Sequence, residues 1–510
     1  MKKIRIILFS CLFVCATFSA CDSFLEVPNK TLIAQDDYFQ TDGDLLKMLS
    51  TSYSNLQDVR IYANYYWKQR GLLTNDVFTI ETDADLAGNY RFDFLLSSGE
   101  LQGLWSSHYK GIRRANMVIR EVPEVVEDAE LVARVKAEAK ALRALFYFQL
   151  IQQWDFIPLR TTENMDEFAV PQVDIDAIYD FVITDLQEII DANALPAAYD
   201  GSVNNERGRL SIWFAKGLLG KIYLFKNEMD KAAPLFKDII DNGGFQLTPS
   251  TEDIWNVNNR FSNENIFEVL YDRDVGGGNF WFDDGVESSE GTQRNIWLEA
   301  MGDIGGYQNL RPTDEFISTF EENDFRLKAF IRQKGDTIYY RNPRVVGGEP
   351  EEMLSDREDP VIAKGHTSEP LNAIGNNESF PIMRLADIYL MYAETQVGKN
   401  EVDAKKYIDM VRDRAFYNPW RDEILPHPST QNLMDGGKTL LQIIQSERRK
   451  ELCFEGHRYN DLRRWGMLNT LVDYNTGKPR FIDGRDYYPV PQKEIDKSGG
   501  VIMQSPNYTL

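Results

Sequence analysis

Apolar side chains recur at helical spacing along much of the chain. Thr41, with Asp44 three residues later, has the capping-box pattern that begins a helix, and the apolar positions after it lie on one face. Further stretches with the same period follow at 104–122, 129–154 and 174–192. We expect the second of these to stop near Trp154, because Pro158 cannot continue a helix.

Residues 211–242 have the spacing of a tetratricopeptide repeat, a pair of antiparallel helices that cross at small residues. Gly220 and Ala232 are expected at the crossing, with Tyr223 and Phe236 filling the groove. Other pairs are predicted at 384–411 and, in more degenerate form, at 104–122 with 129–154 and at 439–455 with 457–467. Any one pair also fits an ordinary amphipathic hairpin, but several together favour a repeat scaffold, which binds partners and carries no chemistry of its own.

A different composition separates these helical parts. Residues 243–380 are rich in Gly, Asn, Asp and aromatic residues, and short strands are predicted at 266–271 and 337–341. We interpret this region as long loops and small strands inserted between the helical units. Ordered loops on a rigid scaffold are where binding sites tend to lie.

The N-terminus has the order of a secretory signal peptide. Basic residues precede an apolar run from Ile6 to Ala16, which is too short to span a bilayer, and Ser19 and Ala20 then precede Cys21 as in a bacterial lipobox. Cleavage after Ala20 would leave a lipid-carrying Cys21, anchored by its buried acyl chains. The alternatives are an ordinary signal peptide that ends at a cysteine and a retained membrane anchor.

Cysteine usage and charge narrow the classes of function. Cys11 and Cys15 leave with the signal peptide, so Cys453 is the one thiol left free, and we expect it to be a buried small hydrophobe. The formal charge is -23, and the signal peptide contributes only positive charge. Such a field repels phosphate backbones and anionic lipid, which argues against nucleic-acid binding.

Charged side chains gather near the C-terminus, where Glu447, Glu451 and Glu455 recur every four residues. Arg448, Arg458, Arg463 and Arg464 lie close by in sequence. A glycoside hydrolase needs two carboxylates facing each other across a cleft. Carboxylates stacked on one helix face among arginines favour structural ion pairs over catalysis.

No metal or phosphate motif emerges from the sequence. The four histidines lack metal-ligand spacing, and His457, after Gly456, is expected to cap or pack. Acidic residues between Asp272 and Glu287 are of a type that binds calcium but lack EF-hand spacing, so a solvated acidic loop is the preferred interpretation. We expect no cofactor.

Several longer motifs resemble the SusD/RagB family of outer-membrane nutrient-binding lipoproteins. They are the lipobox with residues 22–28, the helix and turn at 143–159, and the stretches 384–394, 447–466 and 487–491. One departure is the turn, where Trp154 stands near an expected Tyr-Gly and the glycine is missing. The resemblance spans nearly the whole chain.

The resemblance implies a mainly α fold, in which about four tetratricopeptide-like hairpins support an irregular, loop-rich half with a few short strands. It also implies a lipid-anchored, surface-exposed protein of the outer membrane that acts as a lid for a SusC-like TonB-dependent transporter. We divide the chain into a signal peptide (1–20), an N-terminal helical region (21–242), ligand-binding insertions (243–380) and a C-terminal helical region (381–510), packed as one globular unit.

Aromatic residues in polar loops are the candidates for ligand contact. A sugar ring stacks its apolar face on an aromatic ring while amides and charged groups bond its hydroxyls. The first choice is the stretch 276–309, with Asn279, Phe280, Trp281, Phe282, Trp297, Tyr307 and Asn309. Tyr66 and Trp67 are the second choice, and for each ring the alternative is a place in the core.

Three functions remain open on the sequence. The first is a binding lipoprotein for glycans or other oligomeric nutrients, with no enzymatic activity. The second is a surface-anchored glycoside hydrolase or peptidase, and the third is a helical-repeat scaffold that binds only proteins. The aromatic, Gly-rich insertions favour the first, and nothing in the sequence selects the ligand.

Overall fold

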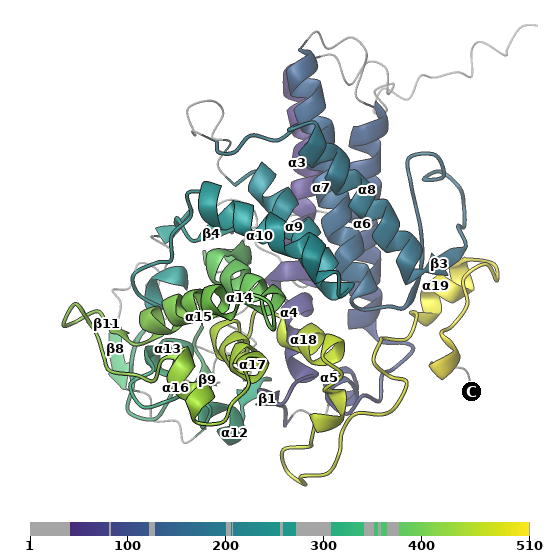
Figure 1. Ribbon diagram of the computed structural model, residues 1–510. Helices are drawn as coiled ribbons and strands as arrows, with labels where there is room; N and C mark the ends of the chain where they lie inside the picture. Colours follow the sequence, from purple (N-terminus) through teal and green to yellow (C-terminus); the bar gives the residue numbers. More distant parts are fainter. Residues whose placement is uncertain are drawn as a thin grey trace, which may run out of the picture.

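The computed structural model describes residues 41–80, 83–121, 128–199, 206, 208–255, 259–271, 308–340, 351–354, 359–364 and 377–508. Within these ranges the chain is mainly helical, and its short strands form two-stranded sheets (Figure 1). The predicted fold class is therefore confirmed. Helices that follow one another along the chain pack on one another, as in a repeat scaffold.

Four helices stand together as a column in Figure 1: α3 (Asp42–Ser54), α6 (Gly99–Glu121), α7 (Ala129–Ile151) and α8 (Ile175–Asp191). The predicted capping box begins α3, where the backbone N–H of Asp44 donates to the Thr41 hydroxyl over 3.3 Å. Helix α7 ends at Ile151, slightly earlier than predicted. A turn follows it, and Pro158 is the last residue of the short strand β2 (Phe156–Pro158). Strand β2 pairs with β3 (Gln172–Asp174), which leads directly into α8.

The predicted repeat at 211–242 is confirmed as a hairpin of α9 (Ile212–Phe225) and α10 (Met229–Asn242). Glycine is required at the crossing, since a Cβ on Gly220 would lie 2.6 Å from a ring carbon of Phe236. The same device joins α6 to α7, where a Cβ on Gly111 would lie 2.5 Å from the Phe146 ring. The small residue sets how closely each pair of helices can approach.

The stack continues from α10 onto α14 (Leu385–Thr395), which forms a second hairpin with α15 (Glu401–Ala415). Helix α17 (Leu440–Glu451) packs on both α14 and α15. The segments 439–455 and 457–467, predicted as a pair, do not pack closely as a hairpin and meet through a buried ion pair of Arg448 with Asp461. Phe454 and Gly456 adopt positive φ angles after α17, and α18 (Arg458–Arg464) packs on α4 (Tyr65–Leu72) instead.

The remaining elements are short. The other helices are α5 (Ala84–Tyr90), α12 (Asp314–Ile317), α13 (Phe325–Phe330), α16 (Thr430–Asp435) and α19 (Gln492–Lys497). The other sheets pair β1 (Val77–Phe78) with β5 (Arg311–Pro312), β4 (Asn265–Val269) with β10 (Phe380–Arg384), β6 (Ile331–Arg332) with β9 (Val361–Ile362), β7 (Thr337–Tyr340) with β8 (Glu351–Leu354), and β11 (Tyr417–Asn418) with β12 (Glu423–Ile424). Short strands at the predicted 266–271 and 337–341 are confirmed as β4 and β7.

Strand β10, at the C-terminal end of the inserted region, pairs antiparallel with β4 inside that region, from Val269–Phe380 to Asn265–Arg384. C-terminal segments also return to the N-terminal helices. The Trp154 indole donates to the carbonyl of Pro489 over 2.9 Å, and the N–H of Tyr488 donates to the carbonyl of Gln153 over 2.8 Å. The N-terminal and C-terminal helical regions are therefore in direct contact with each other.

Glu268 in β4 offers a test of how burial affects stability. Burial raises the pKa of its carboxyl to about 7, although the carboxylate accepts bonds from the Phe261 N–H and the Asn265 amide. Because the folded pKa lies above the unfolded one, Glu268 favours folding at low pH and loses that contribution as the pH rises from about 4.5 to about 7. Between pH 5 and pH 8, we expect the free energy of unfolding from urea denaturation to fall less for Glu268→Gln than for wild type. The two decreases should differ by at most about 3 kcal/mol. Parallel pH profiles of the two proteins would contradict this assignment.

Candidate functional site

Most of the predicted ligand residues lie outside the part of the chain that the structure describes. These are Asn279, Phe280, Trp281, Phe282, Trp297 and Tyr307, together with the acidic loop between Asp272 and Glu287 and the lipobox residue Cys21. The described chain stops at Tyr271 and resumes at Gln308, and both side chains are buried. The Gln308 amide donates to the carbonyl of Pro360 over 3.2 Å, which fixes one end of this segment. These ligand residues stay predictions.

Three predicted ligand residues are described, and all of them are buried. Trp67 is only 2% exposed, and Tyr66 and Asn309 are also buried. The Tyr66 ring packs against Tyr62 with ring centroids 5.1 Å apart, and Gly456 comes close to the same ring. In this structure the two aromatic rings are part of the core, which was the alternative interpretation of this cluster.

An aromatic surface lies where the chain resumes after residue 307. Phe78 of β1 stacks on Tyr474, with ring centroids 4.1 Å apart and planes 15° apart, and Tyr474 is 40% exposed. We call Phe78 and Tyr474, with the polar residues Asp314, Arg311 and Asp359 beside them, the platform surface. Arg311 is the β5 partner of Phe78, so the sheet places these groups next to one another.

Hydrogen bonds hold the platform surface in place. The Tyr474 hydroxyl donates to Asp314 over 2.9 Å, and its backbone N–H donates to the Tyr90 hydroxyl over 3.0 Å. Arg311 and Asp359 form an ion pair of 2.5 Å. A fixed, partly exposed ring bordered by carboxylate and guanidinium groups matches the apolar face and hydroxyl rim of a sugar.

The sequence interpretation missed the platform surface. Tyr474 lies in the polar, turn-forming stretch Asp473–Gly477, the kind of setting that marked 276–309 as a candidate. Phe78 gives no such signal, because its sequence context is typical of an apolar residue in a strand. Their pairing is a long-range contact that sequence spacing does not reveal.

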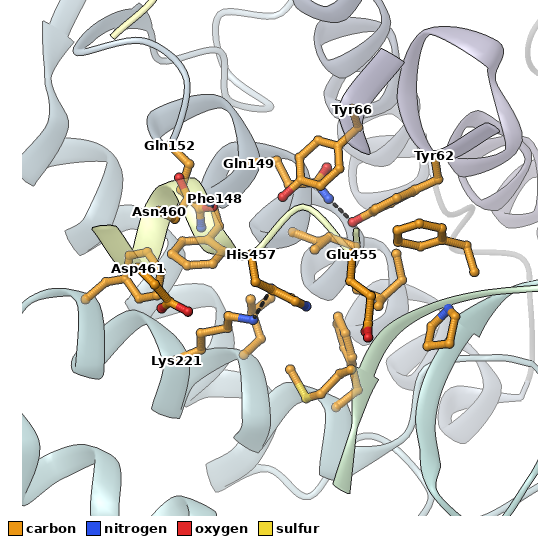
Figure 2. Close-up of a pocket in the computed structure, with 18 of the residues that line it drawn as sticks. Tyr62, Tyr66, Phe148, Gln149, Gln152, Lys221, Glu455, His457, Asn460 and Asp461 are labelled. Carbon is orange, nitrogen blue, oxygen red and sulfur yellow. Dashed lines mark hydrogen bonds between the residues drawn. The ribbon is translucent and has the colours of Figure 1, made fainter. Parts of the chain in front are cut away.

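A second, internal hollow lies between the helical parts (Figure 2). It has a volume of about 40 Å³ and is lined by residues that include Tyr62, Tyr66, Gln149, His457 and Asn460. That volume suits a few water molecules and is too small for a sugar ring. The hollow is therefore part of the folded core and no ligand site for a glycan.

Charged side chains in this hollow are paired. Lys221 binds Asp387 over 2.9 Å, and its ammonium lies 3.3 Å from Nδ1 of His457 (Figure 2). Burial, aided by the positive charge of Lys221, lowers the pKa of His457 to about 4. The imidazole is thus neutral at physiological pH, and its packing role agrees with the sequence interpretation.

The glutamates of α17 and the turn after it form the centre of a buried ion-pair network. Arg384 contacts Glu451 at 2.6 Å, Glu455 at 2.8 Å and Glu264 at 3.0 Å. The other contributors are Arg326, Lys364, Arg412, Arg414 and Lys450. The predicted structural pairing is confirmed for these carboxylates.

The partners differ from those that lie nearest in sequence. Arg448 pairs with Asp387 and Asp461, and Arg464 pairs with Glu394 and Asp461. Burial alone would raise the pKa of Glu455, but the charges of Arg384 and Lys364 outweigh it and hold that pKa at about 2. A carboxylate held ionised in this way is unsuited to act as a general acid.

Other candidate chemistry is sparse in the described ranges. Cys453 is a fully buried free thiol, as predicted, and burial raises its pKa to about 12. Within these ranges no three His, Cys, Asp or Glu side chains are arranged to hold a metal ion. None of the described helices combines the length and the hydropathy that a membrane-spanning segment requires.

Comparison with known proteins identifies the family. A model described as the SusD family matches residues 263–508, and one described as "Starch-binding associating with outer membrane", a SusD-like model, matches residues 24–224. The chain belongs to the SusD/RagB family. The resemblance seen in the sequence motifs is thereby confirmed over both helical parts.

Relatives within the SusD/RagB family match the chain from end to end. It is 26% identical to SusD-like protein P25 of Formosa agariphila, covering 97% of each chain. A SusD-like protein of Bacteroides ovatus is 25% identical, over 96% of this chain and 94% of that one. A solved structure described as a laminarin binding SusD-like protein superposes with a TM-score of 0.74 at 25% identity, covering 92% of this chain and all of the other.

Proposed function

We propose that this SusD-like protein binds glycans, or other oligomeric nutrients, at the cell surface and acts as a lid for a SusC-like TonB-dependent outer-membrane transporter. The observation that carries the proposal is the match along the whole fold to a structure described as laminarin binding. A lipid on Cys21 would hold the protein to the outer membrane. No enzymatic step, metal or cofactor is part of this proposal.

The proposed ligand surface joins two parts. One is the predicted stretch 276–309, with Trp281 and Trp297 as its principal rings. The other is the platform surface, whose Arg311 lies two residues after that stretch and which adds the stacked rings of Phe78 and Tyr474. Together they offer several rings to successive sugars of one oligosaccharide.

Replacing both Trp281 and Trp297 by alanine is expected to weaken glycan binding at least tenfold. Each stacked ring contributes about 0.5–1.5 kcal/mol beyond the area that it buries, and tenfold corresponds to about 1.4 kcal/mol. Isothermal titration with laminarin, amylopectin and xylan would identify a bound polymer and measure the loss.

Phe168→Ala is the matched control, because this ring is 84% exposed on a different loop. Affinity equal to wild type in the double variant would remove 276–309 from the site. A wild-type protein that binds none of a broad panel of glycans and oligopeptides would contradict the proposed function itself.

The same purified protein can be used to test the alternative function, that of a glycoside hydrolase. The α17 carboxylates are buried and ion-paired, so this acidic cluster does not offer the two free carboxylates that a glycoside hydrolase needs. An assay for new reducing ends, run with the bound polymer over many hours, distinguishes the two functions. Sustained release of reducing ends by the purified protein would favour the hydrolase.

A further inference from the structure

An exposed tryptophan stands at the tip of the hairpin formed by β11 and β12. Trp420 is 71% exposed, the most exposed tryptophan among the described residues. Figure 1 shows β11 at the outer edge of the molecule, on a different part of it from β1 and the platform surface. Tryptophan has the largest apolar surface of any side chain, so a ring left this far in water calls for a physical reason.

Hydrogen bonds hold the hairpin backbone that carries the ring, and one neighbouring ring contacts the indole. The backbone N–H of Trp420 donates to the side chain of Asn418 over 3.0 Å, and Asn418 itself is buried. Below the tip, the N–H of Leu425 donates to the carbonyl of Phe416 over 2.9 Å. The Phe325 ring of α13 lies against the indole, with centroids 5.9 Å apart. A pre-positioned ring loses little conformational entropy when a ligand stacks on it.

Polar groups surround the ring at the same tip. The Tyr417 hydroxyl donates to Asp422 over 2.8 Å, which holds that carboxylate in place. Arg421 and Glu423 are 3.6 Å apart and largely exposed, so both can exchange water for ligand hydroxyls. One flat ring bordered by hydrogen-bonding groups fits the face and rim of a sugar.

A protein partner would need a different surface. Stable protein interfaces bury about 800 Å² on each side around an apolar centre. At this hairpin the exposed apolar side chains are Trp420 and Ile424, and charged residues lie between them in sequence. The dimensions and polarity therefore favour a single sugar over a protein interface.

We infer that Trp420 is a second sugar-binding platform, at which one pyranose ring of a long glycan stacks while another part of the same chain occupies the ligand surface proposed above. The inference rests on the proposed function and extends it to polymers. Two contacts on one polysaccharide add avidity that a short oligosaccharide cannot use, because a short chain reaches one contact at a time.

The test compares polymer and hexasaccharide binding in the full mature chain. With laminarin, amylopectin and xylan as probes, Trp420→Ala is expected to weaken binding of the recognised polymer about tenfold, while Trp420→Tyr keeps most of it. Affinity for the corresponding hexasaccharide is expected to stay within about twofold of wild type. Phe168→Ala, another strongly exposed ring, is expected to bind like wild type, and circular dichroism would show that each variant is folded.

Each of the following outcomes would overturn the inference. Unchanged polymer affinity in Trp420→Ala, with binding still lost in the Trp281 and Trp297 double variant, would overturn the second platform alone. Loss of a co-purifying protein partner with unchanged polymer affinity would assign Trp420 to protein contact instead. Failure of the wild type to bind any glycan would overturn this inference, and failure to bind oligopeptides as well would overturn the proposed function with it.

Discussion

Replacing Arg384 by methionine is expected to lower the free energy of unfolding by about 3–5 kcal/mol. Arg384 is 1% exposed and binds Glu264, Glu451 and Glu455 as well as the backbone carbonyl of Glu451. Its removal leaves buried carboxylates with fewer positive partners, and a buried charge without compensation costs more than the pair itself contributes.

Urea denaturation followed by tryptophan fluorescence at pH 7 measures this loss. Arg421→Met is the matched control, because Arg421 is exposed and its contact with Glu423 is 3.6 Å, so a change within about 0.5 kcal/mol is expected. Equal unfolding midpoints for Arg384→Met and Arg421→Met would show that the network contributes little.

Introducing a methyl group at Gly220 is expected to cost about 1–3 kcal/mol, despite the better helix propensity of alanine. The new Cβ would lie 2.6 Å from the Phe236 ring, and that ring is fully buried at the crossing of α9 and α10. The ring cannot rotate away without disturbing its neighbours, so the two helices must move apart.

A double-mutant cycle separates overpacking from other effects. Phe236→Leu removes the ring atoms nearest to the new methyl group, so the combination of Gly220→Ala and Phe236→Leu should cost less than the sum of the two single changes. Gly99→Ala is the control, because its added Cβ would have no atom within 4 Å apart from those of its chain neighbours and its own helix backbone. Additive losses at Gly220 and Phe236 would mean that the crossing is not the source of the effect.

Local signals in the sequence predicted much of the helical scaffold. The Thr41 capping box and the Gly220–Phe236 crossing depend on residues a few turns apart, so spacing alone reveals them. The glutamate partners were not predictable in this way, because Arg384 lies 67 positions from Glu451 and Arg326 lies 125 positions from it. Arg448 and Arg464, which lie near the glutamates in sequence, pair instead with Asp387, Asp461 and Glu394.

The candidate site was predicted less completely, for a related reason. An aromatic residue in a polar stretch of sequence indicates an exposed ring. The same signal is present at Tyr474 and Trp420, but neither residue was singled out from the sequence. Tyr66 and Trp67 gave a similar signal yet are buried, because rings on a helix such as α4 can turn inward together with their polar neighbours. Exposure depends on which distant segment covers a ring.

The ion-pair network has a consequence for the order in which the polypeptide folds. Its acids and bases come from positions as far apart as Glu264, Arg326, Arg384, Arg414 and Glu455, so the network is complete only when the chain as far as Glu455 is present. Until then each charge is better solvated by water than by the protein interior. This part of the molecule should therefore consolidate late and as one cooperative step, once the C-terminal third of the chain is available.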